Sequence, residues 1–253
     1  MNVTELYASL GLPESALVSR RVFKKQFHQF GDLASADRTL LSDQLDSMLW
    51  QYALKPDNCG VKSFVDEQRE YLEIAVLEGR LENRKATVRL AEIVHRVVPY
   101  PVLLVLTDDR GLALSVAHKR LSAAKKDAIV ADPPLHGPWL DGADRDAVEA
   151  AFIDSLALAK LPRADMLDLY GAYADRLVAM QCAAVTGRFR LPTDADTGAP
   201  SRLERLHEAR ALQREVAQLR ANLKNQPSFA RQVELNNTLR MADRRLADLL
   251  ATL

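Results

Sequence analysis

The sequence predicts an α+β fold in which a central mixed β-sheet is flanked by helices and followed by a C-terminal antiparallel helical hairpin. Val102–Leu106 is apolar throughout, and a second β-compatible run begins at Leu112 after an Asp/Gly-rich turn. Two such runs joined by a short turn predict a β-hairpin. A strand that is apolar on both faces is typical of the middle of a helix-covered sheet. Residues 201–253 instead repeat apolar residues at the heptad spacing of paired helices.

The composition predicts a folded protein. Hydrophobic residues make up 48% and charged residues 27% of the 253 residues, close to a globular average. Lys+Arg and Asp+Glu are each 34, so the net charge of zero does not indicate a nucleic-acid or membrane partner. Cys59 and Cys182 lack C-x-x-C spacing, which favours reduced thiols over a disulfide or metal pair. Without an apolar signal core or an 18-residue apolar window, we expect a cytoplasmic protein.

The N-terminal segment combines aromatic and basic residues. A helix over residues 4–18 is expected to break at Gly11 and Pro13. Over residues 19–30, three phenylalanines recur at helical spacing, which favours a core-facing stripe with a solvated basic back: Phe23, Phe27 and Phe30. The alternative is that the cations of this segment bind nucleic acid: Arg20, Arg21, Lys24 and Lys25.

The middle of the chain alternates helical and strand patterns. Ser35 is a suitable N-cap for a helix over residues 36–49, with an apolar stripe of Leu41, Leu45, Met48 and Leu49. Residues 50–56 alternate with period two and end at a proline, which predicts a strand. Further expected elements are a short strand at 61–65, a strand at 71–81, an amphipathic helix at 84–98, a strand at 126–131, a mostly helical stretch at 141–161 and a helix opened by Pro162.

The C-terminal segment predicts two helices that pack together. Residues 187–200 have the composition of a linker, and Ser201 with Glu204 matches a capping box. After these, apolar residues step by four and three residues in two runs separated by a break at 225–228. We call these residues the hairpin seam: Leu212, Val216, Leu219, Leu223, Leu235, Leu239, Leu246 and Leu249. The predicted organisation is an α+β domain over 1–186, a linker over 187–200 and a coiled-coil hairpin over 201–253.

Several phrases of the chain resemble one bacterial protein family. They are WQYALKP, EIAVLEGRL, VPYPVLLVL, ALSVAHKRL and the tail phrase FARQVELNNTLR. Together they resemble the family called domain of unknown function 4391, over about residues 20–253. The resemblance implies an accessory role in restriction-like or phage-defence systems, encoded beside helicases and DNA methyltransferases. It carries no catalytic residues to this sequence.

The order helix, strand, strand, strand, helix, strand also resembles the restriction-endonuclease-like nuclease core. That core places an acidic residue on one strand and D/E-x-K on the next, to hold Mg²⁺ and to position water. The nearest match is Glu78-Gly79-Arg80, but arginine cannot deprotonate to act as a base. Glu73 would face the other side of the strand from Glu78, since five residues is an odd offset. The candidate second carboxylates are Asp57, Asp66, Glu67 and Glu73.

Other polar residues have simpler interpretations. Asp108 and Asp109 favour a tight turn over metal ligation, with Gly111 expected to take a positive φ. The five histidines show no pairwise metal spacing, so no metal site is predicted. No phosphate-binding glycine loop and no G-x-S-x-G motif occurs. The sequence therefore offers no signature of ATP hydrolysis, dinucleotide binding or α/β-hydrolase chemistry.

The leading hypothesis is a non-enzymatic interaction subunit of a bacterial defence system that needs no cofactor. Its partner would be a helicase or DNA methyltransferase, and its hairpin would mediate that contact or self-association into a homo-oligomer. One alternative is an active or degenerate Mg²⁺-dependent nuclease that uses Glu78 with a neighbouring carboxylate. Another is a DNA-binding or other nucleic-acid-binding protein that uses the basic N-terminal segment.

Overall fold

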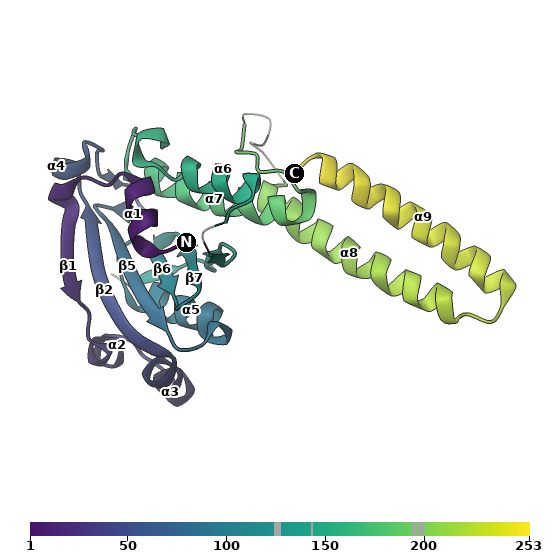
Figure 1. The fold of residues 1–253 in the computed structure, drawn as a ribbon, viewed down its shortest axis with the longest axis horizontal. Coiled ribbons are helices and arrows are strands. Elements are labelled where there is room, and N and C mark those ends of the chain that lie inside the picture. Colours follow the sequence, from purple (N-terminus) through teal and green to yellow (C-terminus); the bar gives the residue numbers. More distant parts are fainter. Residues whose placement is uncertain (124–127, 143, 194–195, 197–199) are drawn as a thin grey trace. The chain divides into compact units, whose positions relative to one another are not determined.

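The computed structural model of the chain describes residues 1–123, 128–142, 144–193, 196 and 200–253 (Figure 1). These residues form two compact units, Met1–Met180 and Gln181–Leu253. Part of the predicted linker over residues 187–200 lies outside the described residues. Across the described ranges, no helix combines the length and the apolar character that crossing a membrane requires.

The first unit contains both helices and strands, and two long helices dominate the second. The helices are α1 (Val3–Leu10), α2 (Lys24–Phe30), α3 (Ser35–Gln44), α4 (Pro56–Cys59), α5 (Thr87–Val97), α6 (Ala147–Ser155), α7 (Met166–Thr186), α8 (Arg202–Asn225) and α9 (Phe229–Ala251), with 3-10 turns at Glu14–Ala16, Arg84–Ala86 and Leu158–Lys160. The strands are β1 (Leu17–Arg21), β2 (Leu45–Leu54), β3 (Phe64–Val65), β4 (Glu70–Tyr71), β5 (Ile74–Leu81), β6 (Val102–Thr107), β7 (Gly111–Val116), β8 (Lys119–Leu121), β9 (Ile129–Ala131), β10 (Leu135–His136) and β11 (Leu140–Asp141).

A mixed sheet organises the first unit, as the sequence predicts. Within the described residues its strand order is β1-β2-β5-β6-β7-β10, and β11 also pairs with β7. β5 and β6 run parallel and are connected through α5, whereas β2 and β7 run antiparallel to their neighbours (Figure 1). Every residue of β6 and β7 is buried, which confirms the predicted hairpin at the middle of a helix-covered sheet.

Helices cover both faces of this sheet. On one face, α2, α3 and α5 pack on the strands in a single core cluster that includes Phe27, Leu41, Leu77, Leu90 and Leu104. Side chains alternate across a strand, so Glu78, which follows Leu77, lies on the opposite face. α1 covers that second face, where the Tyr7 hydroxyl donates to the Glu78 carboxylate at 2.9 Å. The two layers cover the interiors of β5, β6 and β7, so polar groups collect at the ends of these strands.

The basic and aromatic segment over residues 19–30, where the phenylalanine spacing indicates a helical face, is only partly helical. Leu17–Arg21 is strand β1, and only Lys24–Phe30 is helical. Arg20 and Arg21 pair in register with Trp50 and Leu49 of β2, so tertiary pairing outweighs the local helical spacing of the phenylalanines. Phe23 is the N-cap of α2 and is 51% exposed, whereas Phe27 is buried in the core.

The predicted boundary between helix and strand near residue 49 is wrong. α3 ends at Gln44, and Leu45 already belongs to β2. The register between β2 and β5 shifts at Asp46, because Leu45 opposes Leu81 while Ser47 opposes Arg80. This bulge places Leu45 and Met48, three residues apart, in the same core cluster. A bulged strand therefore produced a spacing typical of a helix.

Smaller elements differ from the expectations as well. The predicted strand over 71–81 is interrupted at Leu72, which is 48% exposed, so that β4 ends at Tyr71 and β5 begins at Ile74. The short strand expected at 61–65 is β3, which pairs with β4 in a separate sheet. The strand expected at 126–131 is β9 from Ile129, and residues 126–127 lie outside the described residues. The helical stretch expected at 141–161 contains α6 and one 3-10 turn.

A buried lysine secures the end of α5. The Lys119 ammonium, 3% exposed, donates to the carbonyl oxygens of His95 and Val98. These carbonyls lie at the C-terminal end of α5 and have no partner within the helix. Burial lowers the pKa of Lys119 to about 8. A hydrogen bond of 3.0 Å between His95 Nε2 and Ser115 Oγ further ties α5 to β7.

The second unit contains the predicted pair of helices. α8 begins with the predicted capping box, because Ser201 and Glu204 each bond the backbone of the other. The break at 225–228 separates α8 from α9, and the two helices pack together (Figure 1). Leu212 and Val216 are buried at one end of the seam. The remaining seam residues are half-buried: Leu219, Leu223, Leu235, Leu239, Leu246 and Leu249.

Gly111 is required for close approach rather than for its backbone angle. The positive φ expected here is wrong, because the glycines with positive φ in the described residues are Gly11, Gly60, Gly142 and Gly187. A Cβ at Gly111 would instead lie 2.2 Å from the Leu140 carbonyl oxygen of β11. Any side chain would push β11 away from β7.

We expect Gly111→Ala to destabilise the protein by about 1–3 kcal/mol, the usual cost of overpacking. Gly171→Ala is the matched control. Gly171 lies within helix α7, and the nearest atom to an added Cβ would be His118 Cε1 at 4.0 Å. That variant should gain about 0.5–1 kcal/mol from reduced backbone entropy of the unfolded chain. Urea unfolding of both variants measures the difference, and equal stabilities would show that β11 does not require a glycine at this position.

Candidate functional site

Four neighbouring strands of the sheet, β1, β2, β5 and β6, each have one terminus at the same end of the sheet. Ser47 near the start of β2 lies in register with Arg80 near the end of β5, and Arg80 lies in register with Thr107 at the end of β6. The end of β1 adjoins them, because Arg21 pairs with Leu49. We call this end of the sheet the strand-end site. It collects polar residues because the strand interiors are covered on both faces.

Glu78, two residues before Arg80 on β5, borders the strand-end site from the covered face of the sheet. Its Oε2 accepts hydrogen bonds from the Tyr7 hydroxyl and from Gln51 Nε2, both at 2.9 Å. Burial, followed by the charge of Glu78, raises the pKa of Tyr7 well above its usual range, so Tyr7 is a stable donor. Glu78 is therefore held by two neutral donors from α1 and β2.

Arg80 occupies the position two residues after Glu78, on the same face of β5. Its guanidinium donates to the Asp109 carboxylate, and its Nε lies 3.9 Å from Asp46 Oδ2. The side chains of all three residues are substantially exposed. Arg80 therefore has two acidic neighbours of its own and keeps its positive charge at any pH that the protein encounters.

Asp108 forms the turn between β6 and β7, as predicted. Its Oδ1 accepts from the backbone amides of Arg110 at 2.9 Å and Gly111 at 3.0 Å. Its Oδ2 accepts from Arg84 Nε at 2.6 Å, and the same guanidinium also binds Asp141 on β11. These bonds to Arg84 hold the pKa of Asp108 well below its usual range. Asp108 is thus fully engaged in the turn.

Two adjoining surface cavities open at the strand-end site. One, of about 500 Å³, is lined by Glu78 and Arg80 together with Ser47 and residues of α1. The other, of about 660 Å³, is lined by Arg80, Arg84 and Asp46. Both include residues 108–110 of the β6–β7 turn. The site is thus a solvent-accessible surface with interleaved acidic and basic groups.

The other predicted carboxylates lie away from Glu78, and two of them are paired with cations. Asp66 bonds Arg69 within the β3–β4 connection, at 2.7 Å. Glu73, just before β5, lies 3.3 Å from the Lys55 ammonium. Asp57 belongs to α4, and Glu67 lies in the β3–β4 connection beside Asp66. None of these four residues lines either cavity of the strand-end site.

The residues around Glu78 do not fit the magnesium site of a nuclease. The nearby carboxylates that could join Glu78 as ligands are engaged by arginines, Asp108 by Arg84 and Asp109 by Arg80. Within the described ranges, no group of three or more His, Cys, Asp or Glu side chains is placed to hold a metal ion. We therefore assign no step of a reaction to a metal here.

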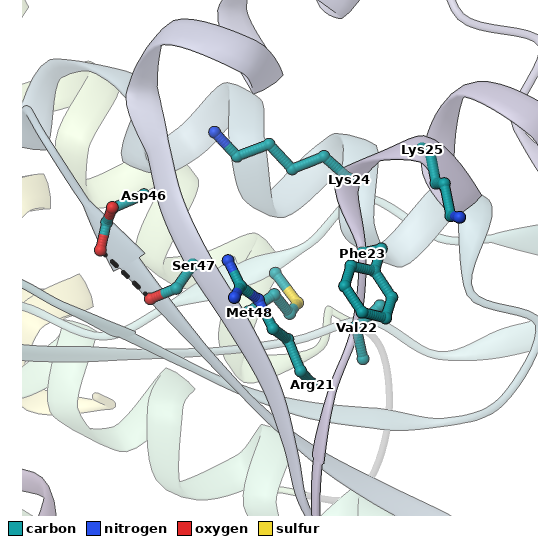
Figure 2. Close-up of a pocket in the computed structure, with 8 residues that line it drawn as sticks. All are labelled: Arg21, Val22, Phe23, Lys24, Lys25, Asp46, Ser47 and Met48. Carbon is teal, nitrogen blue, oxygen red and sulfur yellow. Dashed lines mark hydrogen bonds between the residues drawn. The ribbon is translucent and has the colours of Figure 1, made fainter.

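The basic N-terminal residues form a ridge at the end of β1 and the start of α2. The β1–α2 ridge consists of Arg20, Arg21, Phe23, Lys24 and Lys25. A surface cavity of about 400 Å³ lies beside it, lined by Phe23 and three of the four cations (Figure 2). The same cavity includes Asp46 and Ser47, so it adjoins the strand-end site.

Sequence reasoning missed the residues that reach the strand-end site from other elements. Tyr7 comes from α1 and Gln51 from β2, and both bond Glu78. Arg84 bridges the β6–β7 turn and β11, and its guanidinium carbon lies 4.0 Å from the centroid of the Trp139 ring. None of the three belongs to a spacing motif. The only local signal for Arg84 is a cation placed shortly after the end of a strand.

Comparison with known proteins identifies one family. The model of the family described as domain of unknown function 4391 matches residues 10–246. A search of curated proteins finds no match. A search of solved structures finds none either.

We expect Asp108→Asn to lower the free energy of unfolding by about 1–3 kcal/mol at pH 7, through loss of a charge-assisted hydrogen bond. Because the folded pKa of Asp108 is depressed, its contribution is complete above the unfolded pKa of about 4 and is lost as the pH falls further. The difference between wild type and variant should therefore shrink below about pH 4, as measured by urea unfolding. Asp154→Asn is the control, since that side chain is 71% exposed in its pair with Lys160. An equal, pH-independent loss in both variants would contradict the assignment.

Proposed function

The chain belongs to the domain of unknown function 4391 family, and we propose that it is a non-enzymatic interaction subunit of a bacterial defence system. Its partner is a helicase or a DNA methyltransferase encoded in the same gene cluster, the association that the family resemblance implies. The α8–α9 hairpin binds this partner. The observation that carries this proposal is the exposure of large apolar side chains on α9 away from the seam.

These side chains lie on one outer face of α9. Phe229 is 79% exposed and Val233 is 45% exposed, and residues four apart share a helix face. Arg240 and Arg244 follow Phe229 by about three and four helical turns, so they continue the same face. We call these four residues the α9 outer face. Met241, 71% exposed, lies at its border.

The α9 outer face has the character of a binding surface. Contiguous exposed apolar residues mark interaction sites more often than isolated ones do. Arg240 and Arg244 form no ion pair within the described part of the chain, so an acidic partner surface would complement them. The half-buried seam residues lie on a different face and hold the two helices together. Binding and hairpin formation thus use separate residues.

We expect Val233→Asp to abolish copurification of the partner, because it places a charge on the apolar part of the α9 outer face. The measurement is affinity purification of tagged protein from cells that carry its native gene neighbourhood. A helicase or methyltransferase should be recovered with wild type in near-equal amount. Thr238→Asp is the matched control, since it adds the same charge to an exposed position on another face of α9. Retention of the partner by both variants, or loss with both, would rule out this face as the binding surface.

A Mg²⁺-dependent nuclease is the second candidate, favoured by a specific observation. If α2, α3, α4 and the separate β3–β4 pair are set aside, α1, β1, β2, β5, α5 and β6 follow the restriction-endonuclease-like order, with Glu78 and Arg80 on β5. Arg80 stands where such a core has its lysine. A guanidinium that is bonded to Asp109 and remains protonated cannot activate water as an amine would. This substitution favours the non-enzymatic subunit.

We accordingly expect purified protein to leave supercoiled plasmid and linear DNA intact in Mg²⁺ or Mn²⁺. Glu78→Gln and Glu82→Gln provide the comparison, because Glu82 lies just beyond the end of β5 and does not bond Tyr7 or Gln51. Cleavage that is present in wild type and Glu82→Gln but absent in Glu78→Gln would establish the nuclease instead. Gel electrophoresis of the DNA is a sufficient assay.

A further inference from the structure

The β1–α2 ridge places an exposed aromatic ring between two cations. Phe23 is 51% exposed. The guanidinium carbon of Arg21 lies 5.7 Å from the centroid of its ring, and the Lys25 ammonium lies 5.5 Å away (Figure 2). Cations at these distances are attracted to the ring face. The ring and the two positive charges therefore form one surface feature.

The four cations of the ridge are not neutralised by carboxylates. In the described part of the chain, Arg20, Arg21, Lys24 and Lys25 form no ion pair. The Lys24 ammonium donates at 2.8 Å to the carbonyl oxygen of Ser42, which is a neutral partner. The carboxylate of the same cavity, Asp46, accepts from Ser47 and lies 3.9 Å from Arg80 Nε. A chain of zero net charge thus concentrates positive charge within six residues.

The ridge lies on an accessible edge of the sheet. β1 is the first strand of the sheet and, among the residues that the structure describes, pairs with β2 alone. Its residues from Ser19 to Arg21 are exposed. The positive φ of Ser19, at 47°, accompanies a register shift between Leu17 and Arg20. This irregularity limits the addition of another strand, so the edge offers side chains rather than a backbone ladder for binding.

We propose that the β1–α2 ridge binds single-stranded nucleic acid, with the cations on its phosphates and Phe23 stacked on a base. A positively charged groove beside an aromatic ring is the combination by which proteins hold single strands without sequence preference. Bases of a duplex are already stacked on one another, so Phe23 is available only to an unpaired base. Arg21 is in register with Leu49, which is in register with Glu78. The backbone of Arg21 therefore lies about 10 Å from that of Glu78, two strand spacings away.

Fluorescence anisotropy with a labelled 20-nucleotide oligothymidine tests the proposal. Wild type should bind with a salt dependence of about −0.7 per phosphate contacted. Lys24→Gln with Lys25→Gln should reduce the magnitude of that slope by about 1.4 and weaken binding about tenfold at low salt. Lys62→Gln with Lys85→Gln removes the same charge from exposed positions outside the ridge and should leave binding unchanged. Equal losses in the two double variants would overturn the assignment to the ridge.

Substitutions of Phe23 separate stacking from charge. Phe23→Ala should weaken binding about tenfold with an unchanged salt slope, whereas Phe23→Trp should bind as wild type does, because base stacking is lost in one variant and kept in the other. Unchanged affinity in Phe23→Ala would remove the stacking contact. A 20-base-pair duplex that binds more tightly than the single strand would overturn the preference for unpaired bases.

Two further ligands define the class of partner. Oligouridine of the same length distinguishes RNA from DNA, and binding to either supports the proposal. Polyglutamate of similar length tests whether any polyanion suffices. If polyglutamate binds as tightly as oligothymidine, and if its affinity falls by the same factor in Phe23→Ala, the ridge is a general surface for acidic peptides and the proposal is wrong. These measurements need no partner protein. Their outcome is therefore independent of whether the α9 outer face binds a partner.

Discussion

The complete burial of β6 and β7 is the constraint on which the first unit depends. Every residue of both strands is buried, and a sheet apolar on both faces is stable only when helices cover each one. The parallel pairing of β5 with β6 requires a crossover connection, which α5 supplies and Lys119 secures through the carbonyls of His95 and Val98. The layered architecture follows from these two requirements.

The same constraint decides where polar chemistry can occur. With both faces covered, charged side chains collect where strands end, and Arg80 and Asp109 meet there with the cluster around Arg84. Glu78 is the exception, because it points inward from β5 and has donors from α1 and β2. A carboxylate held by Tyr7 and Gln51 is anchored in place. Its neighbour Arg80 contributes a positive charge to the strand-end site but does not deprotonate, so it cannot act as a base.

The sequence predicted the elements whose apolar pattern was unambiguous. Val102–Leu106 is apolar throughout, and the amphipathic α5 and the α8–α9 pair each keep a helical period over their length. The sequence-based prediction failed where a β-bulge changes the spacing of apolar residues. The bulge at Asp46 places Leu45 and Met48 in the same core cluster, and their three-residue spacing is typical of a helix. At the candidate site, Glu78 and Arg80 were found by their local motif. Tyr7, Gln51 and Arg84 were missed, because only the fold brings them there.

Net charge also concealed the surfaces most suited to binding. Equal numbers of acidic and basic residues argue against a global field, but recognition depends on local groups within about one Debye length, roughly 8–10 Å. Acidic residues of the first unit are engaged by arginines: Asp37 by Arg89 and Arg96, and Asp108 by Arg84. The cations of the β1–α2 ridge and of the α9 outer face have no such partners among the described residues. A chain of zero net charge thus presents two separate basic surfaces, each beside an exposed phenylalanine, and in our proposals each one binds a different kind of acidic ligand.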